Sequence, residues 1–292
     1  MFKLAEKFTG KRFWYYTPNT HNALGTTAVK AAAGFWYVGN VYDVSDVAYG
    51  IAQNGVVEKN ETVLVDNILK SAAPHKQPVV YDIGANTGYY SIFAAYSHKA
   101  YTVAFEPVPA HVACLDESVQ LNGLTDRVRV FTCALGETPE TKDLYLGGSG
   151  SSLNPDFLGD QHADHISVTV EPLDTLASRE QLPSPDFIKI DVEGHELAVL
   201  RGAQKVLRAS TPVLFVEISA SLIRSHSIFR NSHYAATFEL LSSMGYAPYR
   251  LEGNTLIKYD SNDTVREGVC MYLFMHPGIH DRLAATLGIS LI

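Results

Sequence analysis

A short apolar run that ends in an acidic residue and a glycine-containing turn constrains this chain most. The segment VVYDIGANTGYY covers residues 79–90. Its first part, Val79 to Ile83, has the length and residue types of a buried strand, and a helical pattern starts at Tyr89. Strand, tight loop and helix in this order are typical of the first unit of an α/β sheet. In such a sheet, ligands bind outside the carboxyl ends of the strands.

The spacing of the loop residues indicates the kind of ligand. Asp82, Gly84, Asn86 and Gly88 form the pattern D-x-G-x-N-x-G. A pyrophosphate needs the more tightly spaced glycines of G-x-G-x-x-G. Glycines still allow a sharp turn and a close approach of the backbone to a ligand, because they lack a Cβ atom. The pattern therefore favours a cofactor without phosphates, and S-adenosylmethionine has this chemistry.

A second apolar run ends in a carboxylate. Residues 101–105 predict the next strand, which is followed by Glu106 and by Pro107, a residue that stops regular structure. A carboxylate at the end of the second strand of a βαβ unit is placed to accept hydrogen bonds from two ribose hydroxyls. We therefore expect Glu106 to hold a nucleoside, and the alternative is that Asp82 and Glu106 are solvated loop acids.

Ionisable residues also follow a third apolar strand, Phe187 to Val192. Asp191, Glu193, His195 and Glu196 lie just before a predicted helix over residues 197–207. The strand ends of an open α/β sheet meet at one crevice, so these residues are predicted to join Asp82 and Glu106 there. Glu193 and Glu196 also suit the first turn of the helix through its dipole, which would be a structural role.

Several segments together resemble the FkbM-type methyltransferases. They run from about residue 79 to about residue 219 and include VVYDIGANTGYYSIFAA, VAFEPVPAHVACLDESVQLNGL, VTVEPLDTL and PDFIKIDVEGHELAVLRGAQKVL. The resemblance implies the class I fold, which is a doubly wound, mostly parallel seven-stranded α/β sheet with a Rossmann-like order. It also implies an S-adenosylmethionine-dependent methyltransferase that acts on an oxygen of a sugar, a glycan or a small secondary metabolite.

The resemblance further implies how the cofactor residues divide their work. Gly84 and Gly88 would allow the close approach of the backbone, and Asp82 and Asn86 would serve the methionine end. Glu106 would hold the ribose. The adenine would lie between Pro107 and Val108 on one side and Cys133 and Ala134 on the other. The segment VRVFTCALGE departs from the family, which often has Asn before the Ala-Leu pair.

The chemistry of methyl transfer to a hydroxyl points to a base. A hydroxyl is a poor nucleophile unless a base removes its proton as the new bond forms. We expect Asp191, Glu193 and His195 to be the catalytic residues, with Asp191 also near the cofactor and Glu217 as a further candidate base. In an alternative, Asp191, Glu193 and Glu217 would hold a divalent metal that acidifies the acceptor. The spacing does not demand a metal, so this alternative is not favoured.

The chain divides into an N-terminal extension, residues 1–77, and a methyltransferase domain, residues 78–292. Aromatic residues cluster in the extension at 13–16 and 35–37. They would pack the extension against the domain, stack on a sugar acceptor, or serve a homo-oligomer interface. The glycine- and serine-rich segment 147–152 would be either a mobile lid or an ordinary loop.

Composition excludes some partners. The formal net charge is −8 and no run of Lys or Arg is present, which argues against nucleic acid as a partner. No segment is convincing as a membrane span or a signal peptide. Cys114, Cys133 and Cys270 are widely spaced and suit reduced thiols of a cytoplasmic enzyme. The remaining alternatives are an oxidoreductase that uses a nicotinamide dinucleotide and a scaffold without turnover.

Overall fold

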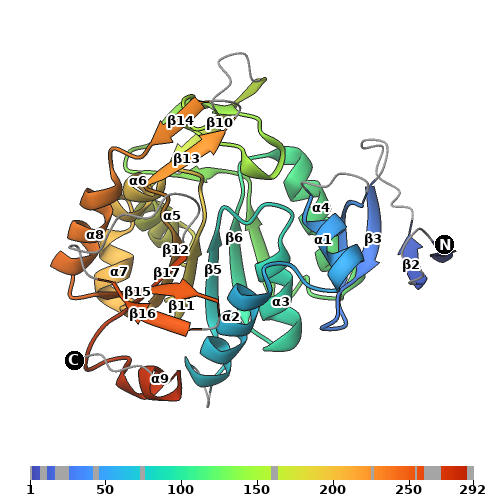
Figure 1. Cartoon of the computed structure of the whole chain (residues 1–292), viewed down its shortest axis with the longest axis horizontal. Coiled ribbons are helices and arrows are strands. Elements are labelled where there is room, and N and C mark those ends of the chain that lie inside the picture. The colour runs from blue at the N-terminus through green and yellow to red at the C-terminus, as the bar shows by residue number, and fades with distance from the viewer. Residues whose placement is uncertain are drawn as a thin grey trace.

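The computed structural model describes nine stretches of the chain. They are residues 2–6, 12–16, 26–41, 46–72, 76–158, 164–224, 227–253, 255–259 and 271–287. Strands and helices alternate over residues 79–131 and again over residues 165–217, as the sequence predicts (Figure 1). Within the described residues, no helix has the length and apolar character needed to cross a membrane.

The largest sheet has eight strands within the described residues, in the spatial order β16-β15-β17-β12-β11-β5-β6-β7. The strands from β12 to β7 are parallel to their neighbours. The remaining pairs, β12–β17, β17–β15 and β15–β16, are antiparallel. Their bounds are β5 Val79–Ile83, β6 Tyr101–Phe105, β7 Val128–Phe131, β11 Phe187–Ile190, β12 Val213–Glu217, β15 Ala247–Glu252, β16 Thr255–Lys258 and β17 Met271–Met275. The expected doubly wound, mostly parallel sheet is confirmed, and β16 adds an eighth strand at the edge to the seven predicted.

Helices cover both faces of this sheet. Alternate strand residues belong to two separate hydrophobic clusters: Val80 and Phe215 face one layer of helices, and Ile188 and Leu214 face the other. Burial on both faces is what makes these strands almost continuously apolar. On the first face lie α2 Lys59–Ala72, α3 Tyr89–Ser97 and α4 Pro109–Leu121, and on the second α5 Leu173–Arg179, α6 Glu196–Arg201, α7 Gln204–Ser210 and α8 Tyr234–Ser243 (Figure 1).

The single helix predicted over 197–207 is two helices, α6 and α7, with a break at Gly202. A Cβ atom at Gly202 would lie 1.9 Å from the carbonyl oxygen of Gly136. The break therefore accompanies a close approach of the chain near Gly136, a long-range contact that helical periodicity does not reveal.

The N-terminal extension packs on the first layer of helices. It contains the hairpin of β3 Thr26–Lys30 and β4 Trp36–Asn40, followed by α1 Val47–Asn54 and α2. Phe35 and Tyr37 are fully buried, with ring centroids 5.8 Å and 6.2 Å from that of Tyr89. The packing interpretation is therefore confirmed for these two residues. The backbone of residues 13–16 lies in β2 Arg12–Tyr16, which pairs with β1 Phe2–Glu6, and the side chains there lie outside the description.

A smaller sheet stands beside the carboxyl ends of the main strands. It consists of β8 Ala134–Leu135, β9 Glu140–Tyr145 and β10 His165–Glu171, in the order β8-β10-β9. The β10 strand therefore belongs to this sheet and not to the main one. The remaining elements are the 3-10 turn Gly148–Gly150, the hairpin of β13 Ser221–Arg224 and β14 Ser227–Arg230, and α9 Asp281–Thr286.

Candidate active site

A pocket that is open to solvent lies at the carboxyl ends of β5, β6 and β11. This is the point where the strand order reverses, because β5 lies between β6, the next strand in the chain, and β11, a later one. Such switch points are the usual ligand crevices of open α/β sheets. The predicted residues on its wall are Gly84, Asn86, Glu106, Pro107, Val108, Cys133, Ala134, Asp191, Glu193 and His195.

The loop after β5 is shaped by two glycines in the left-handed region. Gly84 has φ 77°, and a Cβ there would lie 1.8 Å from the carbonyl oxygen of Asp191. Gly88 has φ 89°, and a Cβ there would lie 2.1 Å from a methyl group of Leu115 on α4. The glycines therefore allow the loop to lie against the rest of the protein, and Gly88 stands behind the pocket wall.

Asp82 lies beneath the pocket and is not on its wall. Its side chain is 1% exposed and accepts a hydrogen bond of 2.6 Å from the hydroxyl of Ser91 on α3. Burial raises the pKa of this carboxyl, and the charge of Lys189 opposes the shift. Direct contact of Asp82 with a cofactor stays a prediction, while its observed contact joins the β5 loop to α3.

Glu106 is held rigidly on the pocket wall. It is 5% exposed, and its two carboxylate oxygens accept hydrogen bonds from the backbone N–H groups of Asn86, at 2.8 Å, and Val108, at 2.9 Å. The ring of His111 lies 3.3 Å from Oε1. A carboxylate has about four lone-pair sites, so acceptor capacity remains for a ligand with two neighbouring hydroxyls.

Apolar groups form the wall next to Glu106. Val108, Ala134, Leu144 and Leu153 belong to one hydrophobic cluster and all line the pocket. Burial raises the pKa of Cys133 to about 12, so its thiol is uncharged at neutral pH. Small, flat, apolar surfaces of this kind suit an aromatic ring such as adenine.

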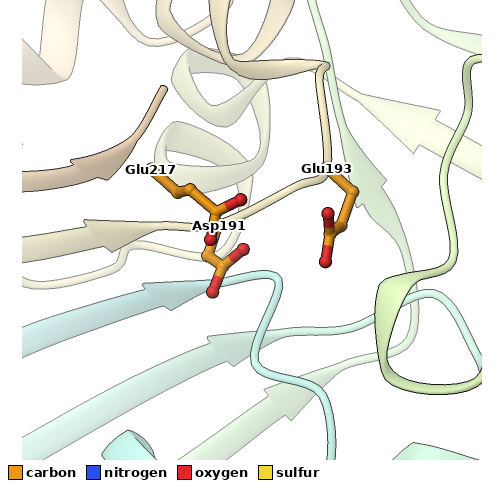
Figure 2. Close-up of side chains that lie close together, drawn as sticks. All are labelled: Asp191, Glu193 and Glu217. Carbon is orange, nitrogen blue, oxygen red and sulfur yellow. The ribbon is translucent and has the colours of Figure 1, made fainter. Parts of the chain in front are cut away.

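Three carboxylates gather where β11 and β12 end. Asp191, Glu193 and Glu217 each offer an oxygen, and these oxygens lie within 4.8 Å of one another. In Figure 2, the carboxylates of Asp191 and Glu217 lie next to each other, and that of Glu193 lies to one side of them. Burial and the nearby charges of Asp191, Glu193 and Glu196 raise the pKa of Glu217 well above its usual range. Asp191 and Glu193 line the pocket, and the cluster is rich enough in negative charge to hold a proton or a cation.

His195 lines the pocket just before α6. Burial, together with the charges of Lys142 and His233, lowers the pKa of His195 to about 4, so its ring is neutral at neutral pH. Its Nε2 atom is buried and has no hydrogen-bond partner among the described residues. Glu196 is different: it is 2% exposed and accepts a hydrogen bond from the N–H of Gly194, at 2.8 Å. The contacts of Glu196 therefore agree with a structural role in the first turn of the helix.

The segment 147–152 is fastened to the site. The hydroxyl of Ser152 donates to the carbonyl oxygen of Glu193, at 2.6 Å, and Ser152 forms a β-bridge with Tyr145. Ser152 is fully buried. These contacts place Leu153 on the pocket wall and favour the ordinary loop over the mobile lid.

The model of the methyltransferase FkbM domain matches residues 82–248 of the chain. This range includes the β5 loop, Glu106 and the whole 189–196 cluster.

The chain belongs to the FkbM methyltransferase family.

Several individual proteins are similar to the chain. The chain is 30% identical over 148 residues to the hexuronic acid methyltransferase AglP of Haloferax volcanii, a match that covers 49% of this chain and 57% of AglP. It is 27% identical over 222 residues to the 2-O-methyltransferase NoeI of Sinorhizobium fredii, covering 70% of this chain and 88% of NoeI. The crystal structure of an S-adenosylmethionine-dependent methyltransferase from Agrobacterium tumefaciens is 14% identical with a TM-score of 0.48, covering 90% of this chain and 73% of that chain. The chain therefore contains a methyltransferase domain of the FkbM family, and its match spans little more than half the length of AglP.

Some residues of this FkbM methyltransferase site are not marked as site residues by any motif in the sequence. Lys189 is 4% exposed, lies under the pocket, and donates to Asp191. Its only sequence signal is a charge that interrupts an apolar strand. Leu144 and Leu153 come from the smaller sheet and its following loop, and no motif marks them. His111 lies in the first turn of α4, which begins at Pro109. The start of the helix at this point brings the ring of His111 to 3.3 Å from Glu106.

Proposed function

We propose that this FkbM methyltransferase transfers the methyl group of S-adenosylmethionine to a hydroxyl of a sugar, a glycan or a small secondary metabolite. One observation carries the proposal. The pocket has, on one wall, a carboxylate beside apolar groups and, on another, two carboxylates and a neutral histidine. The first wall suits a nucleoside, and the second suits a hydroxyl that must lose a proton. The names of AglP and NoeI point to sugar and O-methyl chemistry in the family.

The cofactor residues have chemistry that fits S-adenosylmethionine. Glu106 would accept hydrogen bonds from the two ribose hydroxyls, because its oxygens keep lone pairs beyond those used by the backbone. The adenine would lie among Pro107, Val108, Cys133 and Ala134, which are apolar and mostly buried. Gly84 and Asn86 would face the methionine end, with Asp82 and Gly88 supporting the loop from below.

The acidic cluster would lie near the positive charges of the cofactor. Asp191 lines the same pocket and is held by Lys189, so its carboxylate keeps a fixed direction. A fixed carboxylate attracts an ammonium or a sulfonium group without having to reorganise. When bound, S-adenosylmethionine supplies a methyl group on a positively charged sulfur that leaves as a neutral thioether.

The residues of the chain then act on the acceptor. His195 is neutral, so its ring can accept a hydrogen bond from the acceptor hydroxyl and align the oxygen. The charges of the acidic cluster favour a bound proton, as the raised pKa of Glu217 shows, whereas the surroundings of His195 disfavour one, so we assign the proton to a carboxylate of the cluster. As the oxygen gains the methyl group, its proton passes to Glu193 or Asp191. His195, one of the three candidate catalytic residues, would thus orient the acceptor, while the carboxylates would take its proton.

Isotope labelling tests the proposed function. The protein is incubated with S-adenosylmethionine carrying a ¹³C-methyl group and with separate panels of sugars, glycans, phenols and amines. The proposal predicts a product whose ¹³C NMR signal lies in the methoxy region, and only with a hydroxyl-bearing acceptor. A product with an N-methyl or S-methyl signal would contradict it.

A further inference from the structure

A second hollow adjoins the cofactor pocket on the side of His195. The two spaces share His195 and Leu153 as a common wall. We name the second hollow the acceptor groove and define it by Glu140, Lys142, Asn154, His195, Arg201 and His233, which line it. Any molecule in the groove would meet the cofactor pocket at His195, and this makes the groove the natural approach for an acceptor.

The groove is built from firmly held elements. Glu140 and Lys142 are two residues apart on β9, so their side chains point to the same side of the small sheet. Asn154 follows Ser152, whose hydroxyl accepts a hydrogen bond of 3.0 Å from the N–H of Asn154 while donating to Glu193. Arg201 is the last residue of α6. The groove is thus tied to the same residues that form the candidate active site.

Several polar groups in the groove have hydrogen-bonding capacity to spare. The side-chain oxygen of Asn154 accepts from the N–H of Asp156, at 3.0 Å, but its amide donors bond to none of the described residues. Lys142 is half-buried, and its ammonium likewise makes no ion pair within the described part of the chain. The buried Nε2 atom of His195 likewise has no hydrogen-bond partner among the described residues. Groups of this kind gain by bonding to polar atoms of a ligand.

The balance of charge and surface distinguishes between ligand classes. Glu137 and Glu140 offset Lys142 and Arg201, and Arg201 already lies 3.2 Å from Glu137. A polyanion would therefore gain little. No Phe, Tyr or Trp is present among the described residues that line the groove, so a large flat apolar molecule has no ring to stack on. Mixed donors and acceptors match a ring that carries several hydroxyl groups.

We propose that the acceptor groove binds a glycosyl ring through its neighbouring hydroxyls and presents one of them to the cofactor pocket at His195. Lys142 and Asn154 would donate to ring hydroxyls, and Glu140 would accept from them. The inference rests on the proposed function, because the groove serves an acceptor only if the adjoining pocket holds the methyl donor.

Saturation-transfer NMR on the full chain, with S-adenosylhomocysteine present in excess, tests this assignment. The probes are methyl glucoside, methyl glucuronide and naphthol, and competition among them gives their relative affinities. The proposal predicts signal transfer to the sugar rings in preference to naphthol. Stronger binding of the glucuronide than of the glucoside would support the proposal and indicate that a cation of the groove, Lys142 or Arg201, pairs with the carboxylate.

Matched variants separate the groove from the fold. Asn154→Asp keeps the oxygen that accepts from Asp156 but removes the amide donors, and Lys142→Met removes the ammonium. Lys205→Met is the control, because Lys205 is exposed on α7 and its side chain makes no hydrogen bond or ion pair with the described residues. We expect the first two variants to weaken sugar binding at least tenfold and the control to leave it unchanged.

The affinity for S-adenosylhomocysteine, measured by calorimetry, distinguishes the two proposals. It should be the same in all three variants as in the wild-type protein. Tight binding of S-adenosylhomocysteine with no sugar binding, or with preference for naphthol, would overturn the groove assignment alone. Failure of the wild-type protein to bind S-adenosylhomocysteine would contradict the proposed function as well.

Discussion

The ammonium of Lys189 lies 2.7 Å from Oδ2 of Asp191, and this pair connects the buried core to the wall of the pocket. Lys189 also lies 4.9 Å from the centre of the Tyr90 ring. Burial would lower the pKa of Lys189, but the charges of Asp191, Asp82 and Glu58 raise it above its usual range. One buried cation therefore stands among several carboxylates and fixes the direction of Asp191.

The network reaches into the N-terminal extension. The hydroxyl of Tyr90 donates to Oε2 of Glu58, at 2.7 Å, and Glu58 immediately precedes α2. Burial raises the pKa of Glu58, while Lys189 and the Tyr90 hydrogen bond lower it. Glu58 lies outside the segment matched by the family model, which begins at residue 82. The extension therefore takes part in the support of the site.

Lys189→Met should damage both stability and catalysis. It would leave buried Asp82 and half-buried Asp191 without their cation, and removing one partner of a buried pair costs about 3–5 kcal/mol. The pKa values of the remaining carboxylates should rise, so the acid limb of the pH–rate profile should move to higher pH. Chemical unfolding and a pH profile of kcat/KM measure the two effects. Lys189→Arg keeps the charge and serves as the control. A pH profile of Lys189→Met equal to that of Lys189→Arg would show that the charge has no influence on the carboxylates of the cluster.

Gly84→Ala should disrupt the site far more than Gly123→Ala. Both glycines have positive φ, 77° and 63°, so both substitutions carry a backbone cost of about 1–2 kcal/mol. A Cβ at Gly123 meets nothing within 4 Å, whereas at Gly84 it would lie 1.8 Å from a backbone oxygen. We expect Gly84→Ala to lose cofactor binding and Gly123→Ala to retain it, as measured by calorimetry and thermal unfolding. Equal behaviour of the two would show that the contact with Asp191 is unimportant.

His195→Gln should retain more activity than Glu193→Gln. Glutamine can still accept a hydrogen bond from a hydroxyl, but neither it nor a histidine with a pKa of about 4 holds a proton well at pH 7. Steady-state kinetics at pH 7 compare the two variants. A larger loss of kcat for His195→Gln than for Glu193→Gln would return the role of base to His195.

The same histidine should make the fold sensitive to acid. Its folded-state pKa is lowered to about 4, against about 6.5 in an unfolded chain, so the unfolded state binds the proton more readily between these values. The contribution of neutral His195 is complete above pH 6.5 and is lost as the pH falls towards 4. His195→Gln should therefore flatten the fall in the free energy of unfolding over this range, and an unchanged slope would argue against a buried neutral imidazole.

Removal of divalent metal should leave activity intact. Asp191, Glu193 and Glu217 are close enough to bind a cation, but Lys189 already compensates Asp191, and a proton on Glu217 can satisfy the cluster. We therefore expect the same rate after treatment with a chelator. Loss of activity that Mg²⁺ or Mn²⁺ restores would establish the metal alternative.

The strands along the chain, and the edge of the sheet at which the pocket lies, follow from the sequence because both depend on local patterns. An apolar run of five residues with an acid at its end predicts a buried strand and its functional edge, as at β5 and β6. The structure brings Asp191, Glu193 and Glu217 together because the strands that carry or precede them, β11 and β12, are neighbours in the sheet.

What the sequence does not reveal depends on contacts between distant segments. The break between α6 and α7 depends on the approach of Gly202 to Gly136, and the groove depends on β9 standing beside α6. The lowered pKa of His195 results from burial and from Lys142, which is far from it in the chain. None of these is encoded in a motif, so the sequence could not separate His195 from Asp191 and Glu193 as candidate bases. Cys270 lies outside the described residues.

Calorimetric titration with S-adenosylhomocysteine, on the wild-type protein and on Glu106→Gln, tests directly whether the pocket binds this cofactor and whether Glu106 holds its ribose. Glutamine keeps the shape of Glu106 but cannot accept from Asn86, Val108 and two ribose hydroxyls at once. Glu239→Gln, at an exposed position on α8, is the control. We expect micromolar binding by the wild-type protein and the control, and affinity at least tenfold weaker for Glu106→Gln. Equal affinity in all three proteins, or binding of NAD instead, would contradict it.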